Sequence, residues 1–176
     1  MSKANLVPRH ILSPRIHLKR AGGYFELEMF EQADRELRAL PDEEPWLKKK
    51  KVFQLAIRQE TGDWLNMEMV GRELRLEFPD EEDWWIAEAY ATRRSVSIDE
   101  ARKILLDGLV IHYESALIRY NLACYACVLG HPGECLDLLK EAARRDQKYK
   151  LMAFEDDDLK DVREALKSMG WDSELA

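Results

Sequence analysis

The amino-acid sequence has a period of 34 residues. Four short stretches have the character of turns, and each starts 34 positions after the one before: Glu28, Gly62, Val96 and Gly130. The position shortly after each turn is small or apolar, at Ala33, Met67, Ala101 and Cys135. A fixed period of this length, held for four units without an insertion, indicates a chain built from stacked supersecondary units.

Each unit is predicted to be a pair of helices. In the fourth unit, Leu122, Ala123 and Ala126 recur at helical spacing before Gly130, which is a natural helix stop. Pro132 then suits the first turn of a second helix, where its missing N–H is no loss. The apolar stripe of that helix continues through Cys135, Leu138, Leu139 and Ala142.

These features resemble the tetratricopeptide repeat (TPR) family over residues 14–147. The fourth unit, NLACYACVLGHPGECLDLLKEA, is the strongest match, and Trp85 stands at the family's early tryptophan. Pro45 and Pro79 match its closing proline, and the turns carry an aromatic or apolar residue at Phe30, Trp64 and Ile98. The second unit departs from the pattern at Leu55 and Gly71. The resemblance implies an all-α, right-handed α-solenoid of four helix–turn–helix units.

The sequence predicts three segments. Residues 1–12 are expected to be a flexible lead-in, residues 13–147 to form the four repeats, and residues 148–176 to cap the C-terminal end. A terminal repeat needs a helix that is apolar inside and polar outside. A helix over residues 156–169 meets this need, with an inward stripe of Leu159, Val162, Leu166 and Met169.

Charge and composition narrow the function classes. The formal net charge is −7, which disfavours general binding to nucleic acid or to an anionic membrane. No apolar run approaches the roughly 20 residues of a membrane span. Three cysteines with no recognisable export signal indicate free thiols in a cytoplasmic protein.

The three cysteines and one histidine have spacing that could suggest a metal site. Cys124, Cys127, His131 and Cys135 form the pattern C-x2-C-x3-H-x3-C. Structural zinc sites usually place the C-x2-C pair on a turn, whereas here it falls within a predicted helix. The repeat already requires a small apolar residue at Cys135, and cysteine behaves as one. We therefore expect packing at these positions and no metal or other cofactor.

No catalytic motif is recognisable. The remaining histidines, His10, His17 and His112, are scattered, and Gly22-Gly23 lacks the preceding strand of a phosphate-binding loop. We expect the chain not to be an enzyme. A catalytic site assembled from separate repeats is the alternative that the sequence leaves open.

The family resemblance implies that the first helices of successive units line a concave groove for a partner peptide or helix. This predicts a peptide-binding set that is basic and aromatic, although the chain as a whole is acidic: Lys19, Phe53, Tyr90, Arg93, Arg94, Tyr120 and Asn121. The predicted function is a non-catalytic interaction scaffold or adaptor. Two alternatives remain: a small chaperone for a secreted or aggregation-prone client, and a self-associating structural subunit that forms a homo-oligomer.

Overall fold

The computed structural model describes residues 12–171, and these form helices joined by short turns, without a strand. The chain divides into two compact units, residues 1–62 and 63–176. The division falls between the two helices predicted for the second repeat. The predicted lead-in, residues 1–12, lies outside the described residues except for Leu12.

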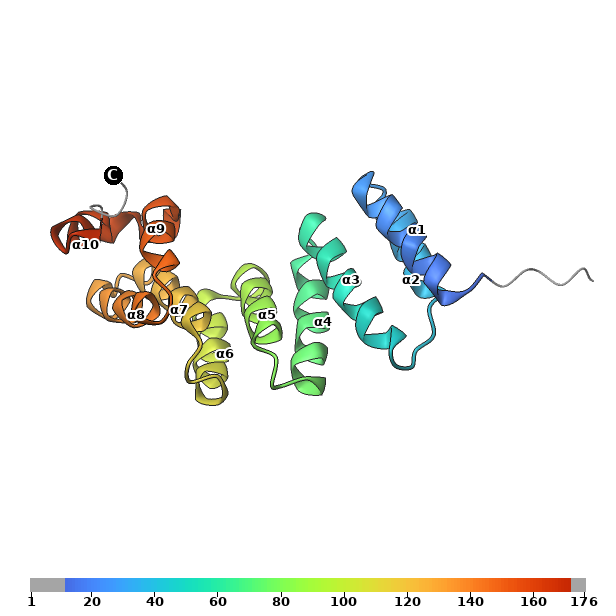
Figure 1. Cartoon of the computed structure of the whole chain (residues 1–176), viewed down its shortest axis with the longest axis horizontal. Coiled ribbons are helices and arrows are strands. Elements are labelled where there is room, and N and C mark those ends of the chain that lie inside the picture. The colour runs from blue at the N-terminus through green and yellow to red at the C-terminus, as the bar shows by residue number, and fades with distance from the viewer. Residues whose placement is uncertain (1–11, 172–176) are drawn as a thin grey trace, which may run out of the picture. The chain divides into compact units, whose positions relative to one another are not determined.

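Within its described residues, 12–62, unit 1 contains three helices: α1 (Pro14–Glu26), α2 (Phe30–Arg38) and α3 (Trp46–Glu60) (Figure 1). Helices α1 and α2 form a hairpin, and α3 packs against α2. Pro14 begins α1 as predicted. Partly buried aromatic rings pack against the small core of the unit. The buried aliphatic side chains that form this core are Ala21, Ala33, Leu37, Leu40 and Ile57.

Unit 2 begins with five helices, which pack on one another in sequence: α4 (Trp64–Glu77), α5 (Glu82–Ser95), α6 (Ile98–Ile111), α7 (Ala116–Val128) and α8 (Pro132–Arg145). Pro132 occupies the first turn of α8, as expected. The main core of the unit lies among α5, α6, α7 and α8 and extends under the C-terminal segment.

The backbone of the turns repeats with the sequence. Glu28, Gly62 and Gly130 have φ values of 57°, 67° and 77°, so three of the four turns use a left-handed residue at the same position of the period. Val96 occupies the remaining position with φ −126°, because a β-branched residue rarely adopts positive φ. There Ser97 caps α6 instead, and its side chain accepts a hydrogen bond from the Glu100 N–H at 3.2 Å.

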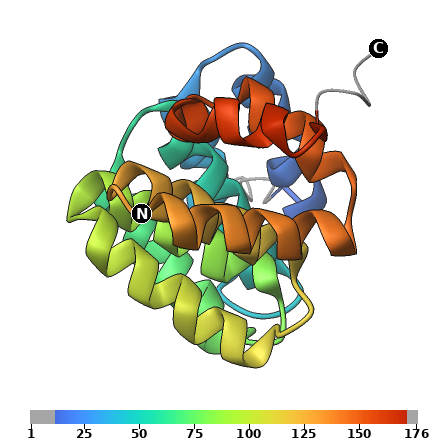
Figure 2. The ribbon, with the colours of Figure 1, turned by 90° about the vertical axis from the view of Figure 1, so that its left-hand side faces the viewer.

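The C-terminal segment is more broken than the single helix predicted over residues 156–169. It consists of α9 (Lys148–Glu155), a 3-10 helix η1 (Asp157–Val162) and α10 (Arg163–Ser168), and it lies against α7 and α8 (Figure 2). The Asp156 side chain starts η1 by accepting a hydrogen bond from the Asp158 N–H at 3.0 Å. Leu159, Val162 and Leu166 are buried as expected, whereas Met169 is exposed.

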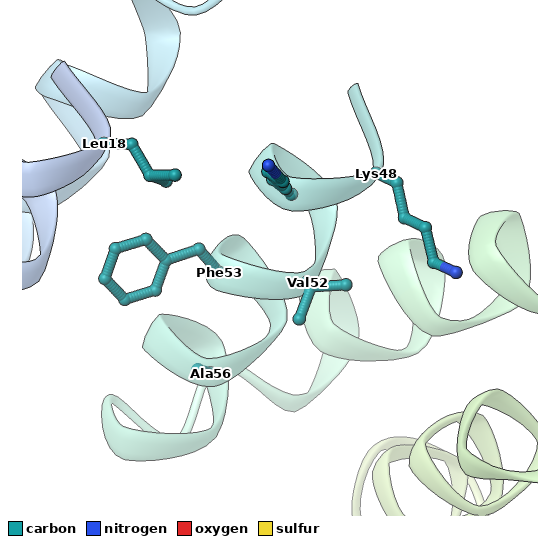
Figure 3. A pocket seen from close by; sticks show the side chains of 6 residues that line it. Leu18, Lys48, Val52, Phe53 and Ala56 are labelled. Carbon is teal, nitrogen blue, oxygen red and sulfur yellow. The ribbon is translucent and has the colours of Figure 1, made fainter. Parts of the chain in front are cut away.

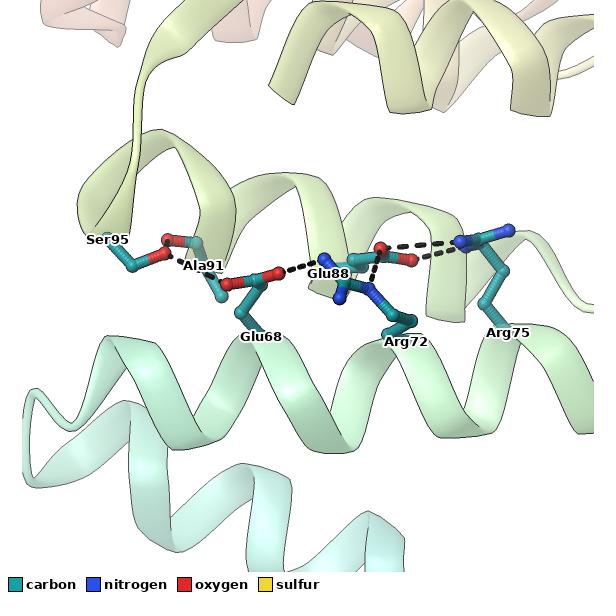
Figure 4. A network of polar contacts seen from close by, with 6 residues as sticks. All are labelled: Glu68, Arg72, Arg75, Glu88, Ala91 and Ser95. Atoms are coloured by element: carbon teal, nitrogen blue, oxygen red, sulfur yellow. Dashed lines mark hydrogen bonds and ion pairs between the residues drawn. The ribbon is translucent and has the colours of Figure 1, made fainter. Parts of the chain in front are cut away.

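A buried ionic network joins α4 to α5. The Glu88 carboxylate is only 1% exposed. It accepts hydrogen bonds from Arg75, and from Arg72 Nε at 3.2 Å (Figure 4). Arg72 also pairs with Glu68, which lies on the same helix. The two helices approach closely because Gly71 has no side chain: a Cβ there would lie 3.1 Å from the Glu88 backbone.

The Glu88→Gln variant should be less stable by about 3 kcal/mol, because it leaves arginine charges facing a neutral amide inside the helix interface. Chemical denaturation followed by circular dichroism measures the change. Asp107→Asn is the matched control: this carboxylate is exposed on α6, and its loss should change stability by less than about 0.5 kcal/mol. Equal stabilities for the two variants would contradict the structural role of Glu88.

Candidate protein-binding surfaces

Arg94 lies in an aromatic cluster at the C-terminal end of α5. Its guanidinium carbon is 3.5 Å from the ring centroid of Tyr90 and 5.0 Å from that of Trp64. The two rings meet edge to face at 5.8 Å. Arg94 is exposed, and within residues 12–171 it forms no ion pair with a carboxylate. A cation held over two aromatic rings without an acidic partner is suited to bind a carboxylate from another molecule.

Arg93, the neighbouring residue, is already engaged within the chain. Its guanidinium forms a two-pronged ion pair with Asp158 of η1, in which Nη2 donates to Oδ1 at 2.8 Å. It also lies 5.3 Å from the ring centroid of Tyr125. The acidic turn that begins η1 therefore occupies the guanidinium that the sequence assigned to a partner peptide.

Tyr120 is covered by the same segment. It is 4% exposed, its ring stacks on Tyr149 of α9 at 4.9 Å, and its hydroxyl donates to Asp156 at 3.0 Å. Cys124 donates to the same Asp156 oxygen at 3.4 Å. Burial, followed by the nearby negative groups, raises the pKa of both the Tyr120 hydroxyl and the Cys124 thiol, so both remain protonated donors.

Asn121 is partly exposed on α7, and its side-chain amide donates to the backbone oxygen of Leu117 at 2.9 Å. Its amide oxygen has no hydrogen-bond partner within residues 12–171 and can accept a hydrogen bond. Asn121 therefore remains a candidate contact.

The remaining two predicted residues lie in unit 1. Lys19 is exposed on α1, and Phe53 of α3 packs its ring against Phe25 at 5.4 Å. Phe53 also lines an apolar hollow between α1 and α3 (Figure 3). The predicted set is thus divided: Phe53 lines the hollow of unit 1, and Tyr90 and Arg94 form the Arg94 cluster. Arg93 and Tyr120 contact the segment around η1, whereas Lys19 and Asn121 belong to none of these groups.

The four residues of the pattern C-x2-C-x3-H-x3-C differ in burial. Cys124, Cys127 and Cys135 are all buried free thiols, whereas His131 is exposed at the start of α8. The described residues do contain a different group whose potential ligand atoms lie within 4.8 Å of one another: Cys124, Asp156 and Asp158. Each of these is engaged already, Asp158 by Arg93 and Asp156 by Tyr120 and Cys124. Those contacts explain the cluster without an ion.

Sequence reasoning missed two features of these surfaces. Trp64 was interpreted only as a turn residue, although its position in the period places it next to the first helix of the following unit. The sequence analysis also assigned no contact to Asp156 or Asp158, which lie at the start of the predicted C-terminal helix. The density of carboxylates in EDDD, residues 155–158, was a signal that this turn could meet a basic side chain elsewhere.

No protein-family model matches the sequence, and no curated protein does. The fold is similar to that in the crystal structure of a thermophilic TPR protein from Thermus thermophilus, with a TM-score of 0.63 and 12% sequence identity. The match covers 90% of this chain and 86% of that chain. The predicted all-α helical-repeat fold of the TPR type is therefore confirmed. Within residues 12–171, no helix has both the length and the apolar character needed to cross a membrane.

The ion pair between Arg93 and Asp158 should be structural. In a double-mutant cycle of Arg93→Ala and Asp158→Ala, we expect a coupling energy of about 1–2 kcal/mol in unfolding stability, since both side chains are mostly buried. The exposed pair Glu164–Lys167 is the control, with an expected coupling of about 0.3 kcal/mol. A coupling near zero for the first pair would leave Arg93 available to a partner.

The three thiols should be unreactive in the folded protein. Burial raises the pKa of Cys135 to about 12 and raises those of Cys124 and Cys127, so less thiolate forms at any given pH. At about pH 8, modification by dithionitrobenzoate should be on the order of 100-fold slower in buffer than in denaturant. Rapid modification of the native protein would show that the α7–α8 interface opens readily.

Proposed function

We propose that the protein is a non-catalytic interaction scaffold or adaptor in the cytoplasm, and that it binds a segment of a partner protein through the Arg94 cluster. The supporting observation is the Arg94 guanidinium held against Tyr90 and Trp64, exposed and without a carboxylate partner among residues 12–171. Aromatic and arginine side chains supply most of the binding energy in many protein interfaces. A helical-repeat fold of the TPR type commonly presents such surfaces rather than catalytic groups.

The proposed partner segment combines an acidic group with apolar contact area. The carboxylate would pair with Arg94, whose planar guanidinium donates in a fork, and the apolar part would lie against Tyr90 and Trp64. Arg93 and Tyr120 contribute indirectly, because η1 already covers them. The free thiols agree with a reducing cytoplasm.

A self-associating subunit is the second candidate, and one observation favours it. Leu106 and Val110 near the C-terminal end of α6, and Tyr113 in the turn that follows it, expose apolar side chains, and Val110 is 80% exposed. Apolar patches of this kind can mark interfaces. Light scattering at several concentrations distinguishes the candidates, because a monomer at all concentrations excludes a stable homo-oligomer.

The decisive test uses a partner captured from native lysate and then purified. The Tyr90→Ala variant should bind that partner about 1–2 kcal/mol more weakly. Arg94→Glu should slow association, with an effect that shrinks as salt is added. Arg144→Glu is the matched control for the charge change, since Arg144 is exposed on α8. Unchanged affinity in a folded Tyr90→Ala, Arg94→Glu double variant would place binding on another surface.

A further inference from the structure

The hollow of unit 1 shares no residue with the Arg94 cluster. It has a volume of about 380 Å³. Figure 3 shows Leu18 projecting from α1 toward Phe53 of α3, and the other residues that form the hollow also belong to α3. Its complete lining is Leu18, Lys48, Lys49, Val52, Phe53 and Ala56.

The floor of the hollow is apolar and held in place. Phe53 packs against Phe25 at 5.4 Å, and Phe25 in turn packs against Phe30 at 5.6 Å. Val52 nevertheless remains 36% exposed. Covering an apolar surface that is exposed to water lowers the free energy of the complex. Because the side chains of this floor are already held in place, binding does not have to order them.

One lysine of the lining, Lys49, has no carboxylate partner among residues 12–171. It lies over the ring of Trp46, with Nζ 5.2 Å from the centroid. The net charge of the chain is −7, so a lysine left without an acid at an apolar hollow indicates a ligand that brings its own acid.

We propose that this hollow binds one bulky apolar side chain of an acidic partner segment, and that a carboxylate flanking this side chain pairs with Lys49. The volume is near the lower end of ligand pockets, roughly 300–1,000 Å³, so it suits one or two side chains rather than a whole helix. This inference rests on the proposed function, since it names the chemistry of the segment that the scaffold binds, but it concerns a different site.

The test uses the full chain and three fluorescein-labelled peptides. The first has one leucine with three acidic residues on each side, the second has alanine in place of the leucine, and the third has lysines in place of the acids. We expect the leucine peptide to bind at least tenfold more tightly than either of the others. Equal binding of the leucine and alanine peptides would overturn the proposal.

Variants locate the binding on the protein. Ala56→Trp fills the hollow without changing charge and should abolish the preference for leucine over alanine. Should that variant fail to fold, Val52→Asn, at a partly exposed position, should reduce the same preference at least threefold. Lys49→Glu should weaken binding of the leucine peptide about tenfold. Lys103→Glu makes the same charge change at an exposed position of α6 and should leave the affinity unchanged.

The remaining outcomes separate this proposal from the proposed function. If Arg94→Glu weakens the leucine peptide and Ala56→Trp does not, the peptide lies on the Arg94 cluster, and the hollow proposal is wrong while the proposed function stands. If N-acetyl-leucine competes as well as the unlabelled peptide, the hollow is a small-molecule site and the segment is excluded. If the preference for leucine over alanine is lost in Ala56→Trp and retained in Arg94→Glu, the peptide binds in the hollow. That result would support this proposal even if Arg94 contacts no partner.

Discussion

The arrangement of unit 2 depends on one buried carboxylate. Glu88 is almost fully enclosed between α4 and α5, where a charge is tolerated only if its partners are close and well oriented. Arg75 and Arg72 supply them, and Arg75 also lies 4.7 Å from the ring centroid of Trp85. Because this network fixes how α5 is rotated about its axis, it also fixes the direction in which Tyr90 and Arg94 project.

Neighbouring arginines on α5 have different roles for a geometric reason. Successive residues of a helix project about 100° apart, so Arg93 and Arg94 cannot face the same surroundings. Arg93 faces the acidic turn of η1, whereas Arg94 faces the rings of Tyr90 and Trp64. The C-terminal segment is therefore more than a solvated cap, since it supplies the acids that satisfy Arg93 and Tyr120.

The period of the sequence predicted the fold well because the helices and turns are local. Ala33, Met67, Ala101 and Cys135 are all buried, as their equivalent positions implied. The candidate site was predicted less completely. The contact between Arg93 and Asp158 joins residues 65 positions apart, and a repeat pattern contains no information on where the segment after the last repeat returns. Gly71 was a departure from the pattern, and the structure explains it by the close approach of α4 and α5.

The acidic composition and the proposed acidic partner are compatible once distance is considered. Much of the negative charge lies in ion pairs such as Glu88 with Arg75 or Asp158 with Arg93, which present little field to solvent. At physiological ionic strength the screening length is about 8 Å, so repulsion from the rest of the molecule is weak at a distance. Contact with Arg94 or Lys49 acts over a few ångströms and is screened far less. An acidic segment is thus selected by the local chemistry of these sites, while the acidic remainder of the surface disfavours its binding elsewhere.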